Sequence, residues 1–271
     1  IVPWNYPLFL AVSPMTSAIA AGNRVMIKMA ARSQHLCRLL QEKFNDKISR
    51  EIVAFLPGIP ADAFTDIPFD HLVFTGSPDV GRTVMAKAAR NLTPVTLELG
   101  GKSPVILGDD FPLEKAVERI MFAKLMNAGQ TCIAPDYLLI PDNKKERFIN
   151  AAARFAKQRY PDINAGTFTS IISHSAFRRL TGLIEDAQRL GARRIDLIPG
   201  AEMNEPLKRL PPAIIDNVTP EMAIMNREIF GPLLPVMTYG HIDEAVDFIN
   251  SRERPLALYL FTEDQRVERK V

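Results

Sequence analysis

Short apolar runs alternate with helical patterns through the first hundred residues, and this alternation most restricts the fold that the chain can adopt. The runs that read as strands lie at 24–28, 52–55, 71–74 and 95–99, and the helical patterns between them lie at 33–44 and 79–90. Strands that alternate with helices are typical of parallel sheets joined by helical crossovers and covered on both faces. The pattern therefore predicts an α/β fold with a Rossmann-type parallel sheet.

The pattern changes character at Gly100-Gly101 and then continues to the end of the chain. Further strands are expected near 105–107, 137–140, 213–215 and 256–261, and helices near 113–128, 144–159, 175–190 and 243–250. We place a domain boundary at this point, so that residues 1–99 belong to a first domain and residues 100–271 to a second α/β domain.

Composition excludes several classes of protein. Apolar residues make up 47% of the chain and charged residues 24%, and the net charge of +2 gives no reason to expect nucleic acid or a membrane surface as a partner. Two cysteines cannot build a disulfide framework, and no Cys/His cluster has metal-ligand spacing. The longest apolar stretch, 8–21, is too interrupted to span a membrane. We expect a cytoplasmic protein with no metal and no membrane anchor.

Both ends of the sequence read as internal positions. The chain begins at Ile1, in what reads as the end of a buried strand, and stops inside a charged helical pattern at 263–271. We therefore expect the native protein to be longer, with both domains incomplete here, and the 271 residues alone to be inactive.

A cysteine and a glutamate stand at positions suited to chemistry. Cys132 follows the helical pattern at 113–128 directly, and Gly129 could end that helix, which would leave the thiol on an accessible turn. Glu98 lies at the end of an apolar strand, where open α/β sheets place ligands and where a buried carboxylate is costly to ionise without a partner. Taken alone, the thiol reads more readily as a small core residue, and the carboxylate fits a solvent-exposed strand end equally well.

Six ordered segments decide between these interpretations. They are Pro3-Trp4-Asn5-Tyr6-Pro7, Ala21-Gly22-Asn23-Arg24-Val25 with Lys28, Phe74-Thr75-Gly76-Ser77 with Val80-Gly81, Leu97-Glu98-Leu99-Gly100-Gly101-Lys102-Ser103-Pro104, Asn127 to Cys132, and Glu228-Ile229-Phe230-Gly231-Pro232. In their order and spacing they resemble the aldehyde dehydrogenase superfamily, and the resemblance covers nearly the whole chain. The separation of 34 residues between Glu98 and Cys132 is that of the family's general base and nucleophile.

Three further segments narrow the resemblance to one branch. Residues 93–98, 129–137 and 254–259 are similar to the class 3 and fatty aldehyde dehydrogenases, and within that branch 70–76 and 159–161 resemble the bacterial coniferyl aldehyde dehydrogenases. The resemblance implies oxidation of an aromatic aldehyde such as coniferyl aldehyde, or of a medium or long aliphatic one, by a protein that is a homodimer at full length. The individual aldehyde does not follow from the sequence.

The resemblance also implies a role for each catalytic residue. Cys132 would attack the aldehyde carbonyl, and the side-chain amide of Asn5 with the backbone N–H of Cys132 would hold the oxyanion. Loss of hydride would leave a thioester, and Glu98 would activate the water that hydrolyses it. Without the family match, Asn5 would be assigned to a turn.

NAD or NADP is the implied cofactor, bound mainly by the first domain. Lys28 would hold the adenosine ribose, and the turn and helix start at Gly76, Ser77 and Gly81 would lie near the pyrophosphate. Glu228 would bind the nicotinamide ribose and Phe230 would pack beside the ring, although alone they read as a surface glutamate and a core phenylalanine. The remaining predicted cofactor contacts are Trp4, Leu99 and Gly100.

One departure from the family pattern bears on the choice of cofactor. The family usually continues Pro-Ser-Glu after the adenosine-site lysine, whereas Lys28 is followed by Met29-Ala30-Ala31. A carboxylate at this place would repel a 2′-phosphate, so its absence, with Arg32 adjacent, favours acceptance of NADP.

Two alternatives stay open. An acylating dehydrogenase would pass the thioester to coenzyme A, but the retained Glu98 argues for hydrolysis because transfer to a thiol needs no activated water. A catalytically silent binding relative is disfavoured by the intact Cys132, Glu98 and Asn5.

Overall fold

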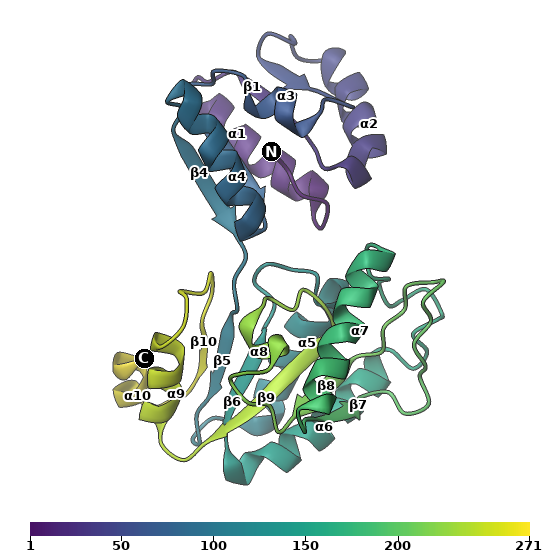
Figure 1. The fold of residues 1–271 in the computed structure, drawn as a ribbon, viewed down its shortest axis with the longest axis vertical. Helices are drawn as coiled ribbons and strands as arrows, with labels where there is room; N and C mark the ends of the chain where they lie inside the picture. The colour runs from purple at the N-terminus through teal and green to yellow at the C-terminus, as the bar shows by residue number, and fades with distance from the viewer. The chain divides into compact units, whose positions relative to one another are not determined.

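Parallel strands joined by helices build both halves of the chain (Figure 1). The computed structural model describes residues 1–271 and divides into two units, Ile1–Gly100 and Gly101–Val271. None of its helices combines the length and apolarity needed to cross a bilayer.

The first unit contains four strands and the helices that connect them. Its elements in chain order are α1 (Pro7–Ala20), β1 (Val25–Ile27), the 3₁₀ turn η1 (Ala31–Ser33), α2 (Gln34–Asn45), β2 (Val53–Phe55), α3 (Ala61–Thr65), β3 (Leu72–Gly76), α4 (Pro78–Ala88), η2 (Ala89–Asn91) and β4 (Val95–Leu99).

The strands of this unit pair in parallel, β1 with β2 and β3 with β4. The first two residues lie between the two pairs. The Ile1 carbonyl accepts a hydrogen bond from Thr75 N–H, and the Ile1 amino group donates one to the Val73 carbonyl. On the other side, Val2 N–H donates to the Lys28 carbonyl, and the Val2 carbonyl accepts from Ala30 N–H. Backbone pairing is therefore continuous across the unit, as expected for one parallel sheet.

The second unit is larger. Its elements are β5 (Pro104–Leu107), α5 (Leu113–Leu125), η3 (Met126–Gly129), β6 (Tyr137–Pro141), η4 (Asp142–Lys144), α6 (Lys145–Arg159), α7 (His174–Arg189), β7 (Arg193–Asp196), β8 (Ala213–Asp216), α8 (Ala223–Asn226), β9 (Leu233–Tyr239), α9 (Ile242–Asn250), β10 (Tyr259–Phe261) and α10 (Gln265–Lys270).

Six strands form one sheet in the order β10-β5-β6-β9-β8-β7, parallel except for β7, which runs antiparallel to β8. Every residue of β5, β6 and β8 is buried, as expected for central parallel strands covered on both faces. Helices α5 and α7 contribute the apolar faces that cover them, and Figure 1 shows α7 crossing the sheet near β8, with β10, α9 and α10 at the opposite end. The core of this unit fixes the positions of the loops that carry Cys132 and Glu228.

The parallel α/β architecture expected from the sequence is confirmed, and the differences are local. The helix expected at 113–128 ends at Leu125, because Asn127, Ala128 and Gly129 adopt the left-handed backbone conformation. The antiparallel strand β7 has no counterpart among the expected elements, and its Arg193 and Arg194 form ion pairs with acidic residues. The helix expected at 33–44 is α2, Gln34–Asn45, and the side chain of Ser33, which precedes it, makes no capping hydrogen bond.

Candidate active site

Cys132 lies on a tight turn between η3 and β6. The turn is closed by the Ala134 N–H, which donates to the Thr131 carbonyl over 3.0 Å. Thr131 and Ala134 are buried, Cys132 is half-buried, and Ile133 is 48% exposed. The thiol is therefore carried by a turn whose ends are fixed in the core while its tip at Ile133 faces solvent, and access of a substrate to Cys132 stays a prediction.

Gln130 anchors the entry to this turn. Its side chain is buried, with a relative exposure of 2%. The side-chain carbonyl accepts from Ile172 N–H over 2.9 Å, and the amide donates to the carbonyls of Asn127 and Ser170 over 3.0 and 3.1 Å. Two of these three hydrogen bonds tie the residue two positions before Cys132 to a segment about forty residues away, and the third closes the local turn at Asn127.

Gly129 brings the cysteine turn against the loop that contains Glu228. A Cβ atom on Gly129 would lie 2.2 Å from the Gly231 carbonyl oxygen and 3.1 Å from that of Lys124, and its φ of +72° also favours glycine. Phe230, the neighbour of Gly231, is itself left-handed at φ 48°. Backbone is in contact with backbone here, so the two loops are positioned together.

The loop at 227–231 is held from outside by three charged side chains. Arg179 of α7 donates to the carbonyls of Glu228 and Ile229 over 3.3 and 2.6 Å. Buried Asp136 accepts from Ile229 N–H over 3.0 Å and forms an ion pair with Lys102, whose ammonium also donates to the Arg227 carbonyl. Because Asp136 lies four residues after Cys132, it links the two loops a second time.

The Glu228 side chain lies in a partly desolvated environment. Burial, reinforced by the charge of Asp136, raises the pKa of its carboxyl group to about 7, while a hydrogen bond from Gly101 N–H and the charges of Arg179 and Lys124 act in the opposite direction. Near neutral pH this carboxyl group therefore exists in both protonation states. It can serve as a hydrogen-bond donor or acceptor for a ligand hydroxyl.

Lys124, in the last turn of α5, is a buried cation that the sequence analysis did not single out. Its side chain is 1% exposed and its ammonium group has no hydrogen-bond partner. Burial lowers its pKa to about 8, partly offset by attraction to Asp136, with Lys102 lowering it further and Glu228 raising it. An ammonium group in this position destabilises the folded protein.

We expect Lys124→Met to stabilise the protein against unfolding. Because the pKa falls from 10.5 in the unfolded chain to about 8 in the folded one, the cost of the charge is fully present below pH 8 and decreases between pH 8 and 10.5. Replacement should raise the unfolding free energy at pH 7 by on the order of 3 kcal/mol and remove the increase in stability above pH 8. Urea unfolding at pH 7 and pH 9.5 checks this, and a lower midpoint for the variant at pH 7 would contradict it.

The other predicted site residues lie in the first unit. Trp4 and Asn5 lie just before Tyr6, the residue that precedes α1, Lys28 follows β1, and Trp4, Asn5 and Lys28 are half-buried. Gly76 ends β3 and Ser77 precedes the first turn of α4, where Gly81 is buried. A Cβ atom on Gly81 would lie 2.8 Å from a methyl group of Leu99, so this glycine allows α4 to approach β4 closely.

Of the two placements that the sequence left open for Glu98, the structure has the solvent-exposed one. Glu98 lies in β4, whose alternating burial pattern turns its side chain to the exposed face of the strand. β4 pairs with β3, and the alternation shows that only one face of β4 is covered. Leu99 and Gly100, which follow it, are half-buried, and the pairing of Glu98 with Cys132 stays a prediction.

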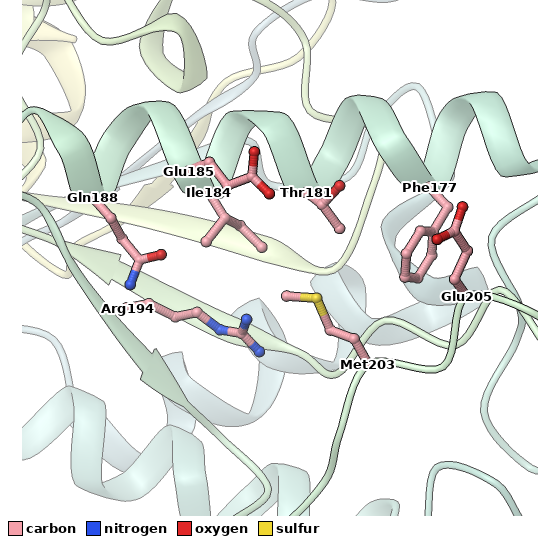
Figure 2. Close-up of a pocket in the computed structure, with 8 residues that line it drawn as sticks. All are labelled: Phe177, Thr181, Ile184, Glu185, Gln188, Arg194, Met203 and Glu205. Carbon is pink, nitrogen blue, oxygen red and sulfur yellow. The ribbon is translucent and has the colours of Figure 1, made fainter.

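One open groove in the second unit does not contain these residues. It has a volume of about 470 Å³ and lies between α7 and the segment that follows β7, lined by Thr181, Ile184, Arg194, Met203 and others (Figure 2). No predicted catalytic or cofactor-binding residue lines it. It therefore adds nothing to the site around Cys132.

Comparison with known proteins agrees with the motifs. The aldehyde dehydrogenase family profile matches residues 1–271. A probable coniferyl aldehyde dehydrogenase of Pseudomonas aeruginosa is 45% identical over 275 residues, which cover 100% of this chain and 57% of the relative. The dimeric NADP-preferring aldehyde dehydrogenase of Mus musculus is 37% identical over 272 residues, 99% of this chain and 58% of the relative.

A solved structure shows the same fold. The substrate-bound state of Staphylococcus aureus AldH superimposes with a TM-score of 0.91 at 37% identity, covering 99% of this chain and 58% of that one. The chain thus spans a little under three fifths of the length of these relatives. It belongs to the aldehyde dehydrogenase family.

Proposed function

We propose that the full-length protein oxidises an aldehyde to its carboxylate with NAD or NADP, using Cys132 as nucleophile and Glu98 as general base. The observation that carries this proposal is the turn of Cys132. It presents a half-buried thiol and is locked through Gly129 and Gly231 to the loop of Glu228. The family membership supplies the reaction class.

Each step uses residues of this chain. The Cys132 thiolate forms a bond to the carbonyl carbon, and the oxyanion that results accepts hydrogen bonds from the Asn5 amide and the Cys132 N–H. A nicotinamide cofactor, when bound, would supply the hydride acceptor for this carbon, so that the adduct on Cys132 becomes a thioester. Glu98 takes a proton from water, whose oxygen attacks the thioester, and the Cys132 thiolate leaves with the C–S bonding electrons.

The proposed cofactor contacts fit a dinucleotide. The close packing of Gly81 on Leu99 positions the N-terminus of α4, where Gly76 and Ser77 offer backbone close to a pyrophosphate. The Glu228 carboxyl group is suited to a ribose hydroxyl. We therefore assign dinucleotide binding mainly to Ile1–Gly100, and the nucleophile together with the Glu228 contact to Gly101–Val271.

The proposed substrate is an aromatic or a medium-to-long aliphatic aldehyde. Two observations support this choice. Several relatives are described as coniferyl aldehyde dehydrogenases, and one from Staphylococcus aureus, 38% identical, as a 4,4'-diaponeurosporen-aldehyde dehydrogenase. Because Met29-Ala30-Ala31 follows Lys28 and brings no carboxylate, we also propose that NADP is accepted.

The test is turnover of the full-length protein on coniferyl aldehyde, benzaldehyde and decanal, with each cofactor and with or without coenzyme A. We expect the free acid as product, and kcat/KM for NADP within about tenfold of that for NAD, a difference of about 1.4 kcal/mol. Acyl-coenzyme A as the product would contradict hydrolysis by Glu98. A preference for NAD of a thousandfold would contradict the cofactor assignment.

A further inference from the structure

One more side chain, that of Tyr259, holds the turn that carries Cys132, and no sequence motif gives this side chain a role. Tyr259 is the first residue of β10, the edge strand that pairs with β5, and lies 126 positions along the chain from Ile133. Its hydroxyl group donates to the Ile133 carbonyl over 2.6 Å. The carbonyl that follows the thiol-bearing residue is therefore held by a side chain from the edge of the sheet.

The phenol is also an electrostatic neighbour of the thiol. Burial raises the pKa of Tyr259, and the negative charge of the Cys132 thiolate raises it further. The hydroxyl group thus stays protonated around neutral pH and remains a donor to Ile133.

The other anchors of the turn act elsewhere. Gln130 fixes its entry, and Ala134 N–H closes it onto Thr131. The exposed tip at Ile133 is stabilised by the hydroxyl of Tyr259. A freely rotating carbonyl beside a thiolate would repel it, whereas a carbonyl that accepts a strong hydrogen bond is fixed in direction and its partial charge is offset.

We propose that Tyr259 is a positioning residue for the nucleophile: its hydroxyl group fixes the Ile133 carbonyl and thereby the orientation and acidity of the Cys132 thiol. This inference rests on the proposed function of Cys132. In this proposal Tyr259 acts on the thiol through the Ile133 carbonyl and does not contact the substrate.

Tyr239 provides a matched control. It lies in β9 of the same sheet, and its hydroxyl group donates to a backbone carbonyl, that of Leu107, over 2.7 Å. Burial raises its pKa to about 12, with Asp109 and Asp110 as the charged neighbours in place of Cys132. Tyr259→Phe and Tyr239→Phe remove the same kind of hydrogen bond, and only the first lies at the turn of the thiol.

The experiment measures alkylation of Cys132 by iodoacetamide in the full-length protein as a function of pH, followed by peptide mass spectrometry. Buried Cys37 in the same chain reports any general opening of the fold. We expect Tyr259→Phe to slow alkylation at neutral pH roughly five- to tenfold, to move the pH midpoint upward, and to lower kcat by a similar factor with the KM for cofactor unchanged. Tyr239→Phe should lower the urea midpoint alone.

A Tyr259→Phe variant with wild-type alkylation, pH midpoint and kcat would overturn the proposal and leave Tyr259 as an anchor of β10. If that variant fails to fold, 3-fluorotyrosine at position 259 keeps the ring and hydroxyl group and makes the phenol a stronger donor. It should accelerate alkylation of Cys132, and an unchanged rate would count against the proposal. The alkylation rate is informative whether or not Cys132 is the nucleophile, whereas full activity of a Cys132→Ala variant would contradict the proposed function instead.

Discussion

Cys132→Ala is expected to reduce aldehyde oxidation by at least about 10⁴-fold, because no covalent intermediate can form without the thiol. Binding of NAD or NADP should persist, since the hydrogen bonds of the Gln130 side chain and of the Ala134 N–H, which hold the turn, are retained in the variant. Steady-state turnover and cofactor titration by fluorescence measure the two quantities on one preparation.

Cys37→Ala is the appropriate control for this variant. Cys37 is fully buried in α2, and burial raises the pKa of its thiol, so it behaves as a small core residue. Its replacement should cost about 1 kcal/mol of stability and leave turnover unchanged. Equal losses of activity in both variants would show that unfolding, and not loss of a nucleophile, causes the effect.

Gly129→Ala is expected to destabilise the protein by at least about 3 kcal/mol and to remove activity at temperatures where the wild type is folded. The added Cβ would lie 2.2 Å from the Gly231 carbonyl oxygen, and this neighbour is backbone, which cannot rotate away. The cysteine turn and the loop of Glu228 would therefore have to separate. Thermal unfolding and turnover at several temperatures measure the effect.

Gly182→Ala tests whether this loss is specific. Gly182 lies inside α7, exposed, and a Cβ atom there meets nothing within 4 Å. Alanine has the higher helix propensity, so this variant should be more stable by about 0.5–1 kcal/mol. A Gly129→Ala protein with the stability of the wild type would show that the two loops are not locked together.

Elements with strong local patterns could be predicted from the sequence. The run at 95–99 is β4 without any shift of its ends, and α6 begins one residue after its expected start, because these segments carry clear apolar periodicity. By contrast, β9 (Leu233–Tyr239) was not predicted, since Pro235 interrupts its apolar run, and β7, which is charged, resembles a loop. Tertiary pairing decides the conformation of such segments.

The candidate site, too, could be predicted from the sequence only in part. The motif containing Cys132 could be recognised, but the hydrogen bonds that hold its turn join Gln130 to Ile172 and Tyr259 to Ile133, positions far apart in sequence. The buried ammonium of Lys124 had no signal at all, since a lysine in an amphipathic helix is normally solvated. Only the tertiary structure reveals these contributions.

The most direct test is to trap the thioester, which is the intermediate between the proposed oxidation step and the proposed hydrolysis step. Glu98→Gln removes the general base and leaves the thiol of Cys132 in place, so one turnover should proceed as far as the thioester. With an aldehyde and cofactor, we expect a burst of about one reduced cofactor per active site, steady-state turnover lower by about 10²–10⁴-fold, and an acyl adduct that peptide mass spectrometry locates on Cys132. Wild-type turnover by this variant, or a burst with no adduct on Cys132, would contradict the assignment of these two residues.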